Sequence, residues 1–165
     1  MKITRPGFTS FAIIDPSKKV QEDGQYVMFV VSETDDIEQL IEDARKRNFE
    51  IRYHYTNVEN EEGGFVPVRL IITEIPPGHV QPFHTHENCY EITVVEQGEV
   101  AYIEDDFLDR ENRQELKDLS KTLTKGDMVF DNLGRRHTVA NFSAAYSRVV
   151  TTQTPKPHNL KFTPD

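Results

Sequence analysis

Short apolar runs dominate the first third of the chain and predict strands rather than long helices. Residues 8–14 are mostly apolar and end at an Asp-Pro pair, which is a strand-stopping signal. Residues 26–31 are β-branched and aromatic, as in a buried strand, and residues 50–58 alternate as a strand should. Three strands are therefore expected before the turn or linker at residues 61–64.

One segment between these strands has the periodicity of a helix. Its apolar residues recur at the i, i+3, i+4 and i+7 positions that form one stripe on a helix surface. They are Ile37, Leu40, Ile41 and Ala44. Thr34 or Asp35 can cap the start of this helix, and Asn48 can end it. Residues 1–64 are thus predicted to form an N-terminal extension of strands plus one helix, packed on the rest of the protein.

The pattern changes at residue 65, after which short strands alternate with Pro, Gly and Asp. The strand candidates are residues 65–75, 91–96, 99–104, 128–130, 137–141 and 145–152. Their spacing is typical of an all-β sandwich or barrel, which we place at residues 65–152. The charged segment 105–118 is expected to be a surface loop or a short helix. Residues 153–165 are expected to form a C-terminal tail.

Composition narrows the classes of function. The 165 residues carry a formal charge of −9, which argues against nucleic acid and an anionic membrane as partners. The longest apolar run is far too short to span a bilayer, and the first ten residues lack the apolar core of a signal peptide. A single cysteine cannot close an intrachain disulfide. The sequence therefore predicts a cytoplasmic protein whose partner is a small molecule.

Three histidines and one carboxylate have a spacing that suits a metal site. His84 and His86 are two residues apart, so in an extended chain both imidazoles point to the same face. Glu91 opens the next strand, and His137 opens another strand after a strong turn signal. Three imidazoles and one carboxylate from two hairpins form a reasonable site for a divalent metal. A pair of histidines alone would be a weak signal of this kind.

The residues around these four ligands resemble the two motifs of the cupin superfamily. The first motif is matched at every fixed position by Gly78-x5-His84-x-His86-x4-Glu91-x6-Gly98. The second is matched by Gly126-x5-Asn132-x-Gly134-x2-His137-x3-Asn141, with asparagine where proline is usual. Asparagine also enters turns, so this departure leaves the ligand set intact.

The resemblance implies a fold and a metal centre. The expected fold is mainly β, an antiparallel, jelly-roll-like cupin barrel with a small N-terminal α/β addition. The expected ligands of one divalent metal per chain are His84, His86, Glu91 and His137. Iron, manganese or nickel is favoured, and zinc, cobalt or copper is possible. If the centre is octahedral, two positions stay open, as in a catalytic site.

Two arginines are candidates for substrate binding. Arg69 lies in an otherwise apolar strand, and Arg148 has a similar setting. Each either clamps a carboxylate or phosphate inside the barrel or lies at an edge with its charge in solvent. The sequence leaves both interpretations open.

The resemblance also implies a class of activity. We expect a metal-dependent enzyme that acts on a small neutral or anionic oxygenated molecule, with a dioxygenase favoured and Glu91 as a general base. A metal-dependent isomerase or decarboxylase and a non-catalytic ligand-binding cupin are the alternatives. A homodimer is expected by analogy with the family.

Overall fold

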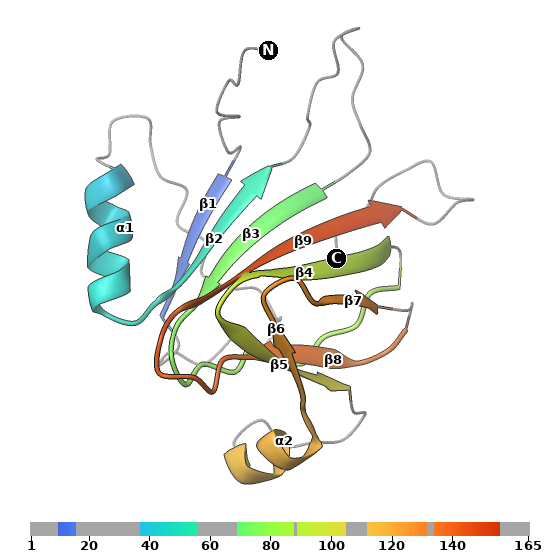
Figure 1. Ribbon diagram of the computed structural model, residues 1–165. Coiled ribbons are helices and arrows are strands. Elements are labelled where there is room, and N and C mark those ends of the chain that lie inside the picture. Colours follow the sequence, from blue (N-terminus) through green and yellow to red (C-terminus); the bar gives the residue numbers. More distant parts are fainter. Residues whose placement is uncertain are drawn as a thin grey trace, which may run out of the picture.

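The computed structural model describes residues 10–15, 37–55, 69–87, 89–104, 112–131 and 134–155. Two antiparallel sheets face each other (Figure 1). The large sheet has the order β1-β2-β3-β9-β4-β7 and the small sheet the order β6-β5-β8. The strands are β1 (Ser10–Ile14), β2 (Glu50–Tyr55), β3 (Arg69–Ile75), β4 (Cys89–Gln97), β5 (Glu99–Glu104), β6 (Lys121–Thr124), β7 (Met128–Asp131), β8 (His137–Ala140) and β9 (Ser147–Pro155). The helices are α1 (Ile37–Lys46) and α2 (Arg113–Leu119).

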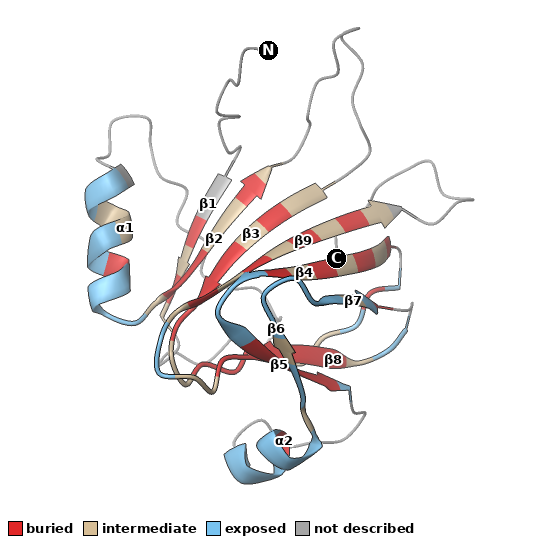
Figure 2. Cartoon of the chain, viewed as in Figure 1, coloured by how far each residue is buried: buried red, intermediate tan, exposed pale blue. Residues whose placement is uncertain are grey.

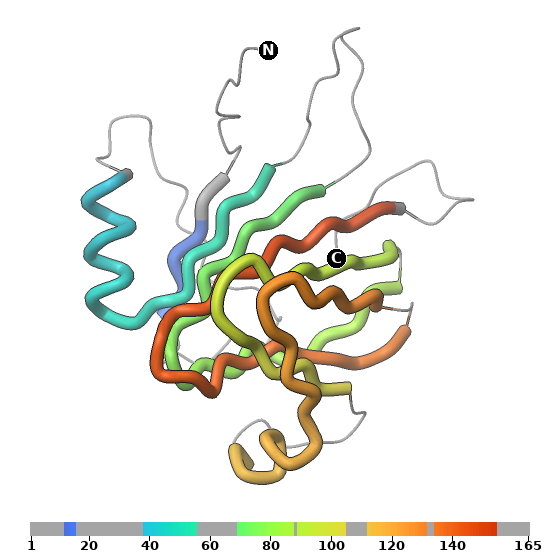
Figure 3. Tube along the Cα trace, in the orientation of Figure 1, coloured from blue at the N-terminus to red at the C-terminus, as the bar shows by residue number. Residues whose placement is uncertain are grey.

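This arrangement confirms the predicted mainly β, jelly-roll-like architecture. Figure 3 shows that strands from distant parts of the chain lie side by side in the large sheet, β9 between β3 and β4. Within the described residues the two sheets remain separate ladders, so the barrel is open at its sides. Isolated bridges from Val80 to Ala140 and from His84 to His137 add the segment after β3 to the edge of the small sheet.

The described part of the N-terminal extension continues the large sheet. β1 pairs with β2 and β2 with β3, so the sheet has no break between the extension and the barrel. Helix α1 packs on the outer face of the sheet, where Ala44 contacts Ile51. Asn48 ends this helix with a φ of 55°. Arg45 on α1 makes two hydrogen bonds, of 2.8 and 2.7 Å, to the carboxylate of Glu74 on β3. The helix prediction is confirmed, while the strand predicted at residues 26–31 lies outside the described residues.

Strand β6 and the end of strand β9 differ from the sequence prediction. Strand β6 has no counterpart in the sequence prediction, because its residues are nearly all exposed and Leu123 is its one half-buried apolar residue. Strand β9 continues to Pro155, three residues beyond the predicted end of the barrel. Gln153 therefore lies in the sheet rather than in a tail. Within the segment 105–118, residues from Arg113 onward form α2, whose Leu116 is fully buried.

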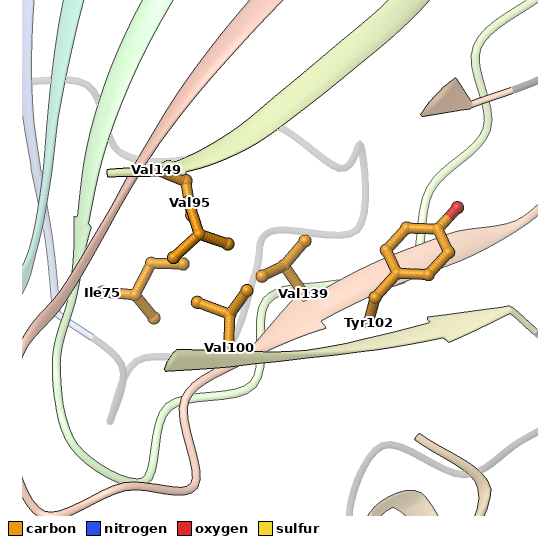
Figure 4. Close-up of a cluster of buried hydrophobic side chains, with 6 residues drawn as sticks. All are labelled: Ile75, Val95, Val100, Tyr102, Val139 and Val149. Carbon is orange, nitrogen blue, oxygen red and sulfur yellow. The ribbon is translucent and has the colours of Figure 1, made fainter. Parts of the chain in front are cut away.

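Alternate residues of the large sheet point into the barrel and form layers. In Figure 2 buried and half-buried residues accordingly alternate along β4 and β9. The innermost layer is apolar and includes side chains from both sheets (Figure 4). Its members are Ile75, Val95, Val100, Tyr102, Val139 and Val149. The next layer contains Thr93 and Thr151, whose hydroxyls are 3.0 Å apart. The layer at the end of the barrel farthest from the apolar layer is polar, and it contains the candidate site.

The turn at Gly98 permits the close packing of β4 and β5 against β9. Gly98 has a φ of 76°, and a Cβ added there would lie 2.8 Å from Oγ of Ser147. We expect Gly98→Ala to lower the free energy of unfolding by about 2–4 kcal/mol, since the left-handed backbone and the overpacking both cost energy. Gly126 also has a positive φ, but a Cβ there meets nothing within 4 Å. Gly126→Ala should therefore cost only about 1–2 kcal/mol. Urea unfolding of the two variants measures the difference, and equal losses would contradict the packing role of Gly98.

None of the helices in the described ranges has both the length and the apolar surface needed to cross a lipid bilayer.

Candidate metal centre

The four predicted ligands come from three adjacent parts of the fold. His84 and His86 lie in the extended segment between β3 and β4. The backbones of His84 and His137 exchange two hydrogen bonds, with N···O distances of 3.0 and 2.9 Å. Glu91 is the third residue of β4, and His137 is the first residue of β8. The bridge between His84 and His137 thus brings residues more than fifty positions apart to one place.

The ligand atoms of these four residues converge. One atom from each of His84, His86, Glu91 and His137 lies within 4.8 Å of the others. Nε2 of His86 is 3.0 Å from Oε2 of Glu91, and Nε2 of His137 is 4.0 Å from Oε1 of the same carboxylate. Three of the four residues are buried and His84 is half-buried. The separations of 3.0 and 4.0 Å match those of ligand atoms around one transition-metal ion at bond lengths of about 2.1 Å.

Backbone contacts orient two of the imidazoles. Nδ1 of His84 is 3.0 Å from the carbonyl oxygen of Pro82, and Nδ1 of His137 is 3.0 Å from the carbonyl oxygen of Arg135. A carbonyl accepts a hydrogen bond only from a protonated nitrogen, so Nδ1 carries the proton and Nε2 keeps its lone pair in both rings. Nε2 of His137 is buried and has no hydrogen-bond partner among the described residues. This lone pair and the carboxylate of Glu91 are the kinds of group that coordinate a metal cation.

Two of the candidate ligands are in the protonation state that a metal ligand requires. Burial, and then electrostatic interaction with the neighbouring His137, lowers the pKa of His84 to about 4, so this imidazole is neutral at pH 7. Burial alone would raise the pKa of Glu91, but hydrogen bonds and charge from its neighbours outweigh burial and hold it at about 2. Chief among these neighbours are His86 and the amide of Gln153. Glu91 is thus a carboxylate at neutral pH.

The sequence did not reveal two further polar residues beside the centre. Gln153 on β9 donates from Nε2 to Oε2 of Glu91 at 2.7 Å. Asp131 on β7 lies opposite Glu91 in the strand register, and its Oδ2 is 3.7 Å from Nε2 of His137. Asp131 accepts a hydrogen bond from the hydroxyl of Tyr102, and burial raises the pKa of this carboxyl group. The one available signal for Asp131 was its place directly after the short strand predicted at residues 128–130.

The two candidate arginines lie on opposite faces of the large sheet. Arg69 lies in the same inward row as Glu91, where Nη1 donates to Oε1 of Gln153 at 3.4 Å and Nη2 is 3.1 Å from Nδ1 of His54. Arg148 is not brought to the centre. Its Nε is 2.8 Å from Oε2 of the exposed Glu96, while Ser147 and Val149, its neighbours in β9, point into the barrel. Alternation along β9 therefore places Arg148 on the outer face of the sheet.

His54 links this region to the pH dependence of folding. Burial, then the charges of Arg69 and Arg52, lowers the pKa of His54 to about 4. An unfolded histidine titrates near pH 6.5, so between pH 6.5 and 4 the unfolded chain binds a proton that the folded protein does not. The contribution of His54 to stability is therefore complete above pH 6.5 and is lost as the pH falls toward 4. We expect His54→Gln to lose less stability than the wild type between pH 7 and pH 5, as measured by urea unfolding. Identical losses would contradict the assignment.

Comparison with known families agrees with this geometry. Residues 71–152 match the model of the cupin domain family, and this range contains all four ligands. The chain belongs to the cupin superfamily. No protein of curated function matches its sequence.

Several solved structures are similar to part of this chain. A predicted oxalate decarboxylase from Thermotoga maritima has a TM-score of 0.50 at 17% identity, and the match covers 66% of this chain and 82% of that one. A Cupin 2 conserved barrel domain protein from Salinispora arenicola has a TM-score of 0.47 at 18% identity, with 62% and 73% covered. KdgF from Halomonas sp. has a TM-score of 0.48 at 16% identity, with 66% and 81% covered. At these identities the likeness concerns the fold alone.

The cupin fold and the convergence of the four candidate ligands are therefore confirmed for this chain. Cupins commonly bind a divalent metal, and the residues present fit one. Which metal is bound, and the roles of Glu91 and Arg69 in a reaction, stay predictions.

Proposed function

We propose that this cupin is a metal-dependent enzyme that acts on a small oxygenated molecule as a dioxygenase. The observation that supports the proposal is the set of three inward-facing imidazoles and one carboxylate, which provides four ligands and would leave two positions of an octahedral ion open. A bound Fe²⁺, Mn²⁺ or Ni²⁺ would supply Lewis acidity and, for iron, redox chemistry toward dioxygen. The favoured substrates are enols, enediols and catechols, whose hydroxyl oxygens would suit an open position.

The residues of the chain would position the substrate and move its proton. Glu91 is ionised at neutral pH, and its Oε1 accepts a hydrogen bond from Thr93 at 3.3 Å. A carboxylate in this place would take the hydroxyl proton of an enol as it binds. The apolar layer beyond Thr93 excludes water from the inner end of the barrel. In the balanced reaction, the C=C bond of an enediol and one dioxygen molecule become two carboxylic acid groups. Dioxygen is the oxidant, and both of its atoms enter the products.

Oxygen consumption tests this proposal. The protein, reconstituted with Fe²⁺ under nitrogen, would be mixed with aerated buffer and members of the enol, catechol and thiol classes in an oxygen electrode. We expect one class to consume one dioxygen per molecule, with both atoms of ¹⁸O₂ found in the product. The matched control is His137→Ala, which should consume none. Absence of uptake with every class would contradict the dioxygenase proposal.

Asp131 favours a second candidate, a proton-transfer reaction without oxygen. This carboxyl group lies beside His137, is 3% exposed and is held by Tyr102. An isomerase or a decarboxylase needs an acid or a base near the polarised substrate, and Asp131 could serve as that group while Glu91 holds the metal. Substrate conversion by the metal-loaded protein under nitrogen, abolished by Asp131→Asn, would support this candidate.

A further inference from the structure

A glutamine outside the ligand set contacts the ligand carboxylate directly. Gln153 on β9 and Glu91 on β4 lie opposite each other in the strand register, and both side chains are buried. Nε2 of Gln153 donates to Oε2 of Glu91 at 2.7 Å. A hydrogen bond from a neutral amide to an ionised carboxylate is among the stronger ones in proteins, and burial keeps water from competing with it. Gln153 is therefore placed to control how the carboxylate of Glu91 is oriented.

The amide of Gln153 has one orientation that satisfies both of its charged neighbours. Its Oε1 accepts from Nη1 of Arg69 at 3.4 Å, while its Nε2 faces Glu91. A guanidinium can only donate hydrogen bonds and an ionised carboxylate can only accept them. If the amide were turned over, its oxygen would meet the carboxylate and its NH₂ group would meet the guanidinium. The neighbours on β3 and β4 thus fix the donor of Gln153 toward Glu91.

The oxygen that Gln153 holds is also the one beside a histidine of the centre. Oε2 of Glu91 is 3.0 Å from Nε2 of His86. Two ligand atoms at right angles around one ion, with bond lengths of about 2.1 Å, have this separation. The other oxygen, Oε1, accepts from the hydroxyl of Thr93 at 3.3 Å. The last torsion of a glutamate side chain is soft, so without the amide the carboxylate could rotate and carry Oε2 away from His86.

We propose that Gln153 is a positioning residue of the metal centre, whose amide holds Oε2 of Glu91 beside His86 in the orientation that binds one divalent ion. The inference rests on the metal centre but not on the reaction proposed above, and it therefore goes beyond that function. A ligand that is already oriented before the metal arrives loses less freedom on binding. The affinity for the metal should therefore depend on Gln153, although Gln153 is not a ligand.

The metal affinity of a variant of similar shape tests the inference. Gln153→Met keeps the length of the side chain and removes the hydrogen-bond donor. The metal-free protein would be titrated with Mn²⁺ under nitrogen, in competition with a chelator of known affinity. We expect Gln153→Met to bind Mn²⁺ about 10–100-fold more weakly than the wild type, which is the usual loss when a group that supports a ligand is removed.

Gln81→Met is the matched control. Gln81 is also a buried glutamine, and its Nε2 donates at 3.1 Å to the carboxylate of Glu50, which is not one of the candidate ligands. Both substitutions remove a buried hydrogen bond to a carboxylate, so both should lower the urea midpoint of the metal-free protein. Only Gln153→Met should also lower the affinity for Mn²⁺.

The electron paramagnetic resonance spectrum of bound Mn²⁺ separates a positioning role from a general loss of structure. At saturating Mn²⁺ we expect broader lines for Gln153→Met than for the wild type, because a carboxylate with more than one orientation gives a range of ligand fields. Gln81→Met should keep the wild-type line widths. If Gln153→Met does not fold, Gln153→Asn replaces it, and we expect the same changes because the shorter side chain withdraws the amide from Glu91.

Four outcomes would overturn the inference. They are the absence of Mn²⁺ binding by the wild type, an unchanged affinity in the Gln153 variant, an equal loss of affinity in Gln81→Met, and a weaker affinity with unchanged line widths. The titration needs neither dioxygen nor a substrate, so its failure is distinguishable from that of the proposed function. Oxygen uptake together with an unchanged Mn²⁺ affinity in Gln153→Met would support the dioxygenase and overturn the positioning role.

Discussion

His84→Ala should reduce the metal content of the purified protein from near one ion per chain to less than about a tenth. The substitution removes one of three imidazoles whose ligand atoms lie within 4.8 Å of the others. Loss of a residue that merely supports a ligand already costs about 10–100-fold in metal affinity, so loss of the ligand itself should cost more. The imidazole of His84 is neutral at pH 7, so protonation does not compete with metal binding at this residue. Plasma emission analysis after dialysis against metal-free buffer gives the measurement.

His54→Gln is the matched control for this experiment. His54 is also buried and also faces the barrel interior, but it contacts Arg69 rather than the metal centre. This variant should keep close to one ion per chain. Retention of metal by His84→Ala, or its loss from both variants, would contradict the assignment of the centre.

Glu50→Gln should lower the free energy of unfolding by about 3–5 kcal/mol, which is the usual cost of breaking a buried ion pair. Glu50 is fully buried on β2, where Oε1 is 2.5 Å from Nε of Arg52. Oε2 is 2.8 Å from Nε2 of His79 and accepts from Nε2 of Gln81 at 3.1 Å. The neutral amide would remove a buried negative charge from beside Arg52 and would weaken the link between β2 and the segment that leads to His84.

The exposed pair of Glu96 and Arg148 provides the control. Glu96→Gln removes the same charge from an ion pair on the outer face of the same sheet, where the cost should be below about 1 kcal/mol. Urea unfolding at pH 7 measures both variants. Similar losses in the two variants would contradict the structural importance of the buried cluster.

Acid should reduce the difference between Glu50→Gln and the wild type. Burial raises the pKa of Glu50, but the charge of Arg52 and the contacts with His79 and Gln81 outweigh burial and hold the pKa at about 2. Because this value lies below the ordinary 4.5, the stabilisation is present above pH 4.5 and is lost as the pH falls toward 2. At pH 3 the two proteins should therefore differ less than at pH 7.

The sequence predicted the four ligands because their positions follow from local geometry. His84 and His86 share a face through the two-residue period of an extended chain, and a turn signal in the sequence at residues 131–134 precedes the strand of His137. The spacing of the two cupin-like motifs then indicated that these four residues belong to one metal site. The helix at Ile37–Lys46 was predicted for the same reason, since its stripe is complete within ten residues.

The lateral neighbours of the ligands could not be predicted in this way. Gln153 and Glu91 are 62 positions apart, and only the register of β9 against β4 brings them together. Asp131 depends in the same way on the pairing of β7 with β4. The register depends on contacts between residues that are far apart in the sequence. A shift of one residue in the pairing would turn every side chain of the strand to the opposite face of the sheet. Arg148 was ambiguous because its strand has apolar residues on both faces, so alternation did not show which face is inward.

Anomalous diffraction from crystals of the protein reconstituted with Mn²⁺ tests the metal centre most directly. The account predicts one strong peak per chain, within about 2.0–2.3 Å of Nε2 of each of the three histidines and of a carboxylate oxygen of Glu91. Absence of a peak at this position in crystals that contain manganese, or a peak bound by other residues, would contradict the account.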